Sequence, residues 1–290
     1  MPERAAAARV AMIVPALGGS AAGLEQDARA QSRPPDEVIV VAGVRPNGRA
    51  RNEGVRRTSA EVLVFVDDDA RLGDARVIER LVGPLLGDPT IGVTGTAKLL
   101  PPGAPAFQRA VARQVPRIEH PVVHAPLESN PRLDGPGASS VTTTCAAMRR
   151  ETWERAGGFS ETLFRGVDTE FFVRVRALGL RFVQVPDAWV WHPAPATLRA
   201  LLRKHWFYGI GYAQEVRRDP RRGGWRTLAT PLHAALYLLL RTLLIVPHAF
   251  IAWSDDARTP RLAFRPLGAL ASYAAALGYV RGWYGASPRE

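Results

Sequence analysis

The sequence predicts a mostly parallel α/β sheet that is flanked by helices and followed by a helical C-terminal appendage. Apolar, β-branched runs at residues 10–14, 37–41 and 62–66 have the length and composition of buried strands. Stretches that can form helices separate these runs, and strand, helix, strand at this spacing is typical of a parallel sheet. We therefore expect an α/β domain over residues 8–195 and a helical tail over residues 196–290.

The first strand could be mistaken for a signal peptide, because Arg4 and Arg9 precede its apolar run. That run is brief and is broken by Pro15, so we interpret it as part of the sheet. Residues 21–32 can then form a helix, which two consecutive prolines end before the second strand begins.

A short helix is predicted over residues 48–60, between the second and third strands. It places Arg51 and Asn52 near the carboxyl edge of the sheet. Arg51 could grip a phosphate there or hold an aspartate in place. A solvated helix charge is the alternative interpretation.

The third strand runs directly into Asp67, Asp68 and Asp69. Three like charges at one strand end repel each other, and ligands bind at the carboxyl ends of strands in open α/β sheets. A divalent cation would explain the cluster, and oxygen ligands favour Mg²⁺ or Mn²⁺ over zinc. The alternative is that the aspartates cap the following turn.

Four motifs in this half of the chain occur in the order found in a known family. They are Val-Pro-x-Leu at 14–17, Glu-Val-Ile-Val-Val at 37–41, Ala-Arg-Asn-x-Gly at 50–54, and the strand that ends in three aspartates. The set resembles the nucleotide-binding half of family 2 glycosyltransferases, which have the GT-A fold. The resemblance implies that Pro15, Arg51, Asp67 and Asp68 bind a nucleotide-sugar donor, and that Asp67 and Asp69 hold the cation.

The middle of the chain is predicted to be irregular. Residues 91–95 have the pattern of a strand, and the proline-rich residues 101–137 follow it. We expect no regular helix or central strand in that stretch. His120 and His124 lie inside it, and we interpret them as exposed loop histidines without a ligand role.

A further helix is predicted to begin near Asp168, because an apolar stripe starts at Phe171 and ends at Gly179. Capping alone would explain an aspartate at that position. The order Arg-Arg, Gly-Gly-Phe and Gly-x-Asp-Thr-Glu-Phe, however, is similar to the acceptor half of family 2 glycosyltransferases. By that resemblance Asp168 is the general base for the acceptor hydroxyl, and His192 completes the metal site with Asp69.

Two positions depart from the family pattern. Val167 stands where the family usually has Glu, and Ala42-Gly43 stand where it commonly has an acid that contacts the nucleobase. The alternative function is therefore a catalytically inactive relative that acts as a membrane-associated binding protein.

The tail is expected near a membrane. Residues 197–216 predict a basic amphipathic helix, which could lie on an anionic membrane or could cover the α/β domain. Residues 228–253 are strongly apolar but are interrupted by two prolines and Arg241, and residues 266–280 are shorter than the roughly 20 residues of a membrane span. We expect interfacial or re-entrant helices and peripheral attachment.

Length and composition fit one large domain or one domain with an appendage. The 290-residue chain is 47% hydrophobic, which is ample for a core. Its formal net charge is +11, and only Lys98 and Lys204 of its 38 basic residues are lysines. Such a surface suits phosphates, nucleic acid or anionic lipid, although it also fits a GC-rich genome. The single Cys145 excludes an intramolecular disulfide and favours a reducing, cytosolic setting.

The expected function is metal-dependent, inverting transfer of a sugar from a nucleotide-sugar donor to a hydroxyl acceptor, with Mg²⁺ or Mn²⁺ as cofactor. Membrane apposition would suit a lipid-linked or cell-envelope glycan acceptor, and we expect the protein in the cytoplasm, peripheral or integral at the inner face of the cell membrane. We expect no nucleic-acid partner, because the sequence has no recognisable zinc finger, basic zipper or RNA-binding aromatic motif.

Overall fold

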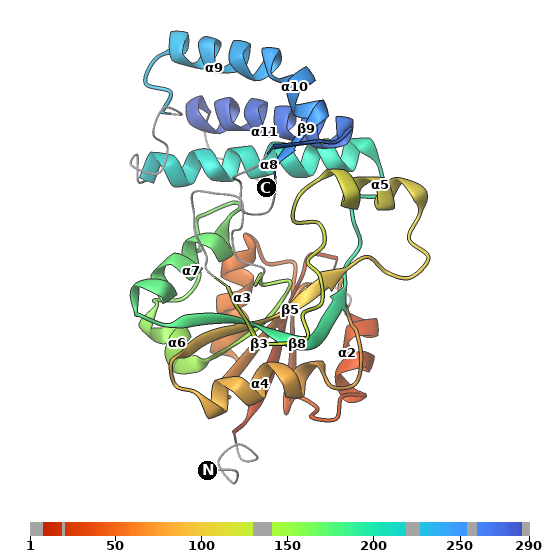
Figure 1. The fold of residues 1–290 in the computed structure, drawn as a ribbon. Helices are drawn as coiled ribbons and strands as arrows, with labels where there is room; N and C mark the ends of the chain where they lie inside the picture. The colour runs from red at the N-terminus through yellow and green to blue at the C-terminus, as the bar shows by residue number, and fades with distance from the viewer. Residues whose placement is uncertain (1–7, 19–20, 130–140, 219–226, 254–259, 286–290) are drawn as a thin grey trace.

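The structure is a computed structural model that describes residues 8–18, 21–129, 141–218, 227–253 and 260–285. Figure 1 shows a sheet domain with helices on both of its faces. A layer of helices from the C-terminal part of the chain lies above this domain in the view of Figure 1.

The sheet confirms the predicted fold class. In spatial order its strands are β2 (Glu37–Ala42), β1 (Val10–Ala16), β3 (Val62–Val66), β7 (Cys145–Arg149), β5 (Ile91–Leu99), β8 (Arg181–Trp191) and β4 (Arg71–Leu72), and β6 (Leu127–Ser129) also pairs with β8. β1 pairs parallel with β2 and β3, and β5 pairs parallel with β8. Because β7 is antiparallel to both β3 and β5, the five strands β1, β2, β3, β5 and β8 all run in one direction.

Helices cover both faces of the sheet. α2 (Ala22–Arg29) and α4 (Val77–Gly87) pack on one face, and α3 (Asn47–Arg56), α6 (Arg150–Arg155) and α7 (Val167–Ala177) pack on the other. In β3, Val62, Val64 and Val66 belong to the first core and Leu63 and Phe65 to the second. Successive side chains of a strand point to opposite faces, so a strand that is apolar at every position is buried on both sides.

The prediction for residues 101–137 was wrong in part, because α5 (Ala106–Gln114) is a regular helix. The prolines flank this helix and do not interrupt it. Pro105 is its N-cap residue, and Pro116 follows its end. A proline costs little at a helix start, where its missing N–H would have had no partner within the helix. Residues 130–137 of the predicted loop lie outside the described residues.

The C-terminal part forms the helical layer. It contains α8 (Leu198–Arg218), α9 (Pro231–Leu243), α10 (Ile245–Phe250) and α11 (Pro266–Tyr284), and β9 (Ile251–Trp253) pairs antiparallel with β10 (Pro260–Leu262). α8 lies nearest the sheet domain, α11 packs along it, and α9 forms the outer side (Figure 1). α8 and α11 approach closely, since a Cβ at Gly209 would stand 2.0 Å from the carbonyl oxygen of Ala275. Within the described residues, no helix has the length and apolar character needed to cross a membrane.

The basic amphipathic helix is covered on two sides. Gly211 of α8 lies against Arg165 of the sheet domain, where an added Cβ would meet the Arg165 Cβ at 2.6 Å. On the other side, Ala213 packs with Tyr279 of α11. The sequence allowed this helix to lie on an anionic membrane or to cover the α/β domain. In the structure it covers the α/β domain.

Candidate active site

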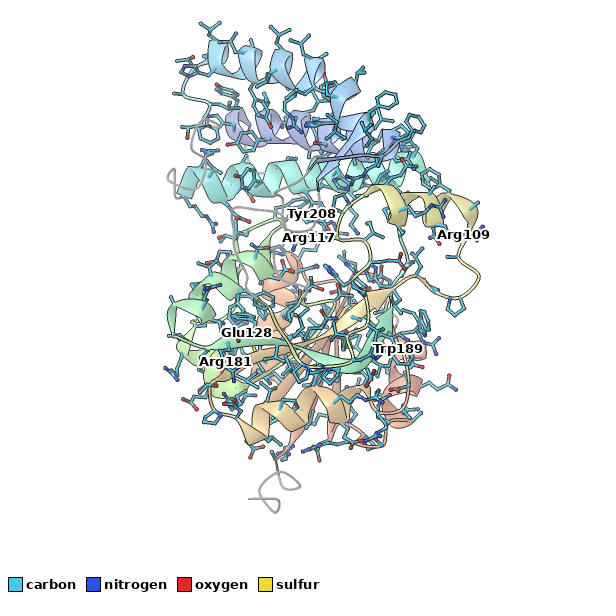
Figure 2. All side chains as sticks on the ribbon, in the orientation of Figure 1. Arg109, Arg117, Glu128, Arg181, Trp189 and Tyr208 are labelled. Carbon is cyan, nitrogen blue, oxygen red and sulfur yellow. The ribbon has the colours of Figure 1, made fainter. Side chains whose placement is uncertain are left out.

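A cavity of about 440 Å³ lies between the sheet domain and α8. Its walls come from α3, from the ends of β3, β5 and β8, from the segments after α5 and before β7, from the residues that lead into α7, and from α8. Figure 2 shows Tyr208 on α8 and Arg117 after α5 in this region, and both line the cavity. The ionisable side chains that line it are Arg51, Asp67, Lys98, Arg117, His120, Arg165, Asp168, His192, Lys204, His205 and Tyr208.

Asp67, Asp69 and His192 bring three potential ligand atoms within 4.8 Å of one another. His192 Nε2 stands 3.3 Å from Asp69 Oδ1, and the His192 side chain is only 12% exposed. Adjacent ligands of an octahedral ion with bonds of about 2.1 Å lie about 3 Å apart. The three side chains are thus close enough to converge on one divalent ion, and Mn²⁺ accepts imidazole nitrogen beside carboxylate oxygen.

The electrostatics of the aspartates also favour a cation. Burial raises the pKa of the Asp68 carboxyl, and the negative charges of Asp69 and Asp67 raise it further. For Asp69, burial raises the pKa, but the hydrogen bond and charge of His192 and the charge of Lys204 outweigh it and lower the pKa overall. Positive charge brought to this end of β3 stabilises the ionised carboxylates, which is what a bound divalent ion would do.

Asp67, Asp69 and His192 are called the metal-type cluster below. Arg51 lies beside this cluster and contacts one of its aspartates. It is 4% exposed, and its Nη2 donates a hydrogen bond of 2.9 Å to Asp67 Oδ1. The guanidinium also lies 5.6 Å from the centroid of the Phe159 ring. α3 can bring Arg51 this deep because Gly54 lets the helix approach β1, where an added Cβ would stand 2.4 Å from the side chain of Ile13.

Asn52 connects two motifs that lie far apart in the sequence. Its Nδ2 donates to the carbonyl oxygen of Phe159 at 2.8 Å, and its Oδ1 accepts from the Phe159 N–H at 2.9 Å. The Ala-Arg-Asn-x-Gly helix is thus bonded to the backbone of the Gly-Gly-Phe segment. These paired bonds fix the segment that leads into α7 relative to Arg51.

Asp168 is the second residue of α7, whose N-cap residue Gly166 has a φ of 75°. Its Oδ1 accepts the Thr169 N–H at 3.0 Å, and the residue lines the cavity. The carboxylate therefore bonds to the start of its own helix and also borders the cavity. The preceding Val167 is 4% exposed and packs in the core, so it adds no charge beside Asp168.

The cavity does not include every residue that the sequence singled out. Arg51, Asp67, Asp168 and His192 line it, whereas Pro15, Asp68 and Asp69 do not. Pro15 is buried in β1 opposite Val41, and Asp68 Oδ2 accepts the Leu17 N–H at 3.1 Å. Of the three residues that could hold an ion, Asp67 and His192 border the cavity together with Asp168, and Asp69 does not.

The interpretation of His120 as an exposed loop residue was wrong. It is 8% exposed, and its backbone pairs with that of Lys98 through hydrogen bonds of 2.8 and 3.1 Å. His124 is exposed, with 85% of its side chain accessible, and its Nδ1 lies 2.7 Å from Asp187 Oδ1. Sequence reasoning also missed Lys98, Lys204 and His205 as cavity residues. The available signal was the scarcity of lysine, with both lysines of the chain lying here.

Comparisons with known proteins found a matching family model and several relatives. A family model described as "Glycosyltransferase like family 2" matches residues 4–209. The O-antigen biosynthesis protein RfbC of Myxococcus xanthus is 28% identical over 175 residues, which are 56% of this chain and 13% of that protein. A pre-mycofactocin glycosyltransferase of Mycobacterium tuberculosis (strain CDC 1551 / Oshkosh) is 26% identical over 208 residues, which are 70% of this chain and 42% of that protein. The chain thus spans less than half the length of these two relatives.

One solved structure is similar over nearly the whole chain. It is the mannosyltransferase PcManGT from Pyrobaculum calidifontis, in complex with GDP-Man and Mn²⁺. The alignment covers 96% of this chain and 87% of that one, with a TM-score of 0.55 and 17% sequence identity. At this identity the similarity shows a shared fold, and it extends through the C-terminal helices as well as the sheet domain.

Proposed function

The chain belongs to glycosyltransferase-like family 2, and from this premise we propose that it transfers a sugar from a nucleotide-sugar donor to an acceptor hydroxyl, with inversion at the anomeric carbon. The observation that carries the proposal is the placement of Asp67, Asp69 and His192 beside a cavity that Asp168 also lines. A cation site next to a carboxylate-lined cavity suits glycosyl transfer from a diphosphate, because the ion supplies positive charge and the carboxylate can accept a proton.

Asp67, Asp69 and His192 would hold Mg²⁺ or Mn²⁺. The ion, when bound, would supply positive charge to the diphosphate as the leaving group gains negative charge. Arg51 keeps Asp67 in position through their 2.9 Å hydrogen bond. The solved mannosyltransferase with this fold was obtained with GDP-Man and Mn²⁺, which is a nucleotide sugar together with a divalent ion.

Asp168 would act as the general base. One carboxylate oxygen bonds the Thr169 N–H, and a carboxylate can accept further hydrogen bonds, including one from an acceptor hydroxyl in the cavity. In the proposed step the acceptor oxygen bonds to the anomeric carbon, the bond from that carbon to the diphosphate breaks, and the hydroxyl proton moves to Asp168. A single displacement of this kind inverts the anomeric centre.

Donor binding is the first test. Calorimetric titration against a panel of nucleotide sugars, with Mn²⁺ and then with a chelator, should reveal binding of one donor that requires the metal. Asp69→Ala should abolish this binding, whereas Glu151→Ala, which removes an exposed acid on α6, should leave it unchanged. Absence of binding to every donor under both conditions would instead favour the inactive relative, with Ala42-Gly43 as the first cause to examine.

We also infer that the outer side of the helical layer contacts a lipid surface. Six exposed apolar side chains follow one another along α9 and α10 at spacings that alternate between four and three residues, so they form one stripe. Each of these residues is 49% to 66% exposed. They are Leu232, Leu236, Leu239, Leu243, Val246 and Phe250. Residues 227–253 and 260–285 contain no Asp or Glu, so α9, α10 and α11 carry no carboxylate that an anionic membrane would repel.

Co-sedimentation with phospholipid vesicles tests this surface. The protein should pellet with vesicles that contain an anionic phospholipid, and the double variant Leu236→Ser/Leu239→Ser should remain in solution. Leu127→Ser is the matched control, because Leu127 is 48% exposed on β6. Dimerisation through the stripe without vesicle binding would contradict the inference. Attachment of this kind would place the enzyme near lipid-linked or cell-envelope glycan acceptors at the inner face of the cell membrane.

A further inference from the structure

Both lysines of the chain line the same cavity. The sequence has 38 basic residues, and all except Lys98 and Lys204 are arginines. Lys98 lies near the end of β5 and Lys204 in the first half of α8, so the two lysines reach the cavity from opposite walls. An ammonium group is a compact charge whose three N–H donors can rotate, unlike the planar guanidinium. The cavity thus combines both lysines of the chain with Arg51, Arg117 and Arg165.

Neither lysine has a carboxylate partner at ion-pair distance within the part of the chain that the structure describes. Lys98 Nζ donates one hydrogen bond of 2.9 Å to the carbonyl oxygen of Arg117, which leaves two of its N–H donors. Lys204 Nζ lies 6.0 Å from the centroid of the Tyr208 ring. Two cations in one half-buried cavity repel each other, and an anion between them would relieve that repulsion.

Two histidines accompany the lysines. His120 pairs through its backbone with Lys98, and His205 follows Lys204 directly. The Nε2 atoms of both histidines are buried and have no hydrogen-bond partner among the described residues. A buried polar group that lacks a partner costs about 1–3 kcal/mol. His120, at 8% exposure, therefore holds an unused donor or acceptor at the cavity wall.

The charge state of these groups suits an anion. Burial, and then the charge of Lys98, lower the pKa of His120 to about 4, and burial with the charge of Lys204 lowers that of His205 to about 4. Both imidazoles are then neutral at pH 7, and a neutral imidazole can donate from Nε2. Burial, together with the charges of Lys204 and Arg117, lowers the pKa of Lys98 to about 8, although the charges of Asp67 and Asp168 act in the opposite direction. Lys98 therefore remains mostly protonated at pH 7.

We propose that Lys98, Lys204, His120 and His205 bind a phosphate group carried by the acceptor. This inference rests on the proposed glycosyl transfer, because it assigns the cavity beside Asp168 to the acceptor. Asp168 lines the cavity, whereas Asp68 and Asp69 lie outside its lining. Two point charges with rotating donors suit a tetrahedral dianion, whereas a planar carboxylate is matched better by an arginine fork.

The probe for the first experiment is inorganic phosphate, followed by ³¹P NMR line broadening. The protein is first saturated with Mg²⁺ and with the nucleoside diphosphate that the donor titration identifies, whose own ³¹P resonances report its occupancy. The ³¹P resonance of added inorganic phosphate should then broaden, and the nucleotide should stay bound. Lys98→Gln and Lys204→Gln should each weaken phosphate binding at least tenfold, with nucleotide affinity changed less than twofold.

Arg29→Gln is the matched control, because it removes an exposed cation on α2 outside the cavity. Phosphate that competes with the nucleotide, or lysine variants that lose the nucleotide in equal measure, would assign the lysines to the donor diphosphate and overturn the proposal. Unchanged phosphate binding in both lysine variants would overturn it too. Failure of the wild-type protein to bind any nucleotide would refute the proposed function, and phosphate broadening in that same sample would still test the subsite.

The phosphate could belong to a soluble molecule or to a lipid headgroup, which offer the same chemistry to the cavity. Glycerol 3-phosphate and vesicles that contain phosphatidic acid separate the two sources in competition with inorganic phosphate. Competition by the soluble ester alone indicates a soluble acceptor, and competition by the vesicles indicates a lipid-linked one. If neither competitor displaces inorganic phosphate at concentrations at which inorganic phosphate itself saturates the site, the acceptor does not carry a phosphate group.

Discussion

His192 Nε2 and Asp69 Oδ1 lie 3.3 Å apart, although one residue follows β8 and the other follows β3. The sheet order separates these two strands by β7 and β5, so only the tertiary fold brings the side chains together. A histidine and a carboxylate at this separation can bond to each other or can share one ion. The two possibilities differ in their response to added metal.

Replacing His192 should weaken metal binding. We expect His192→Ala to lower the affinity for Mn²⁺ by about tenfold or more, because one of three protein ligands is lost. Electron paramagnetic resonance of free Mn²⁺ measures this directly. His124→Ala is the matched control, since that histidine is 85% exposed and pairs with Asp187 instead. Equal affinities for wild type and His192→Ala would show that His192 only bonds to Asp69.

Arg51 should matter for stability as well as for the site. Its side chain is 5% exposed and pairs with Asp67, so Arg51→Met leaves a partly buried carboxylate without its partner. We expect a loss of about 1–3 kcal/mol in the free energy of unfolding. Adding Asp67→Asn should recover part of this loss, because the uncompensated charge is then gone. Urea unfolding of the single and double variants measures the coupling, and strictly additive losses would argue against the ion pair.

Lys98 should destabilise the unliganded protein at neutral pH. Its folded-state pKa of about 8 lies below its ordinary value of 10.5, so folding disfavours the charged form. Below pH 8 both states keep the proton and the full cost is present. Between the two pKa values only the unfolded state keeps it, so stability rises with pH.

Lys98→Met should therefore raise the free energy of unfolding at pH 7 by about 1–3 kcal/mol. Loss of the hydrogen bond to the carbonyl oxygen of Arg117 offsets part of this gain. The gain should disappear near pH 11, where Lys98 is neutral in both states. Urea unfolding at both pH values measures the difference, with Arg29→Met as control. The same variant should bind phosphate more weakly, so stability and binding move in opposite directions. A loss of stability at pH 7 would show that Lys98 supports the fold instead.

Sequence patterns predicted the parts of the fold that depend on local composition. β3 could be identified because all five of its residues are apolar, and α7 because its stripe ends at a glycine. α5 was missed because proline counts say little about helices that begin immediately after a proline. The burial of His120 was missed because it depends on backbone pairing with Lys98. Lys204 and His205 could not be placed, since nothing local in α8 indicates which of its faces meets the sheet domain.

Asp168 provides the sharpest test of the proposed chemistry. Asp168→Asn keeps the size of the side chain and an oxygen that can accept the Thr169 N–H, so α7 should start as before. The amide cannot take the acceptor proton, and we expect kcat to fall by about 10²–10⁴-fold. Donor affinity should stay within about twofold, because the metal-type cluster is unchanged, and Tm should move little since the N-terminal hydrogen bond remains. A fall in donor affinity that matches the fall in rate would move Asp168 to the donor site. A rate close to that of the wild type would mean that Asp168 serves the start of α7 alone and that another group accepts the proton.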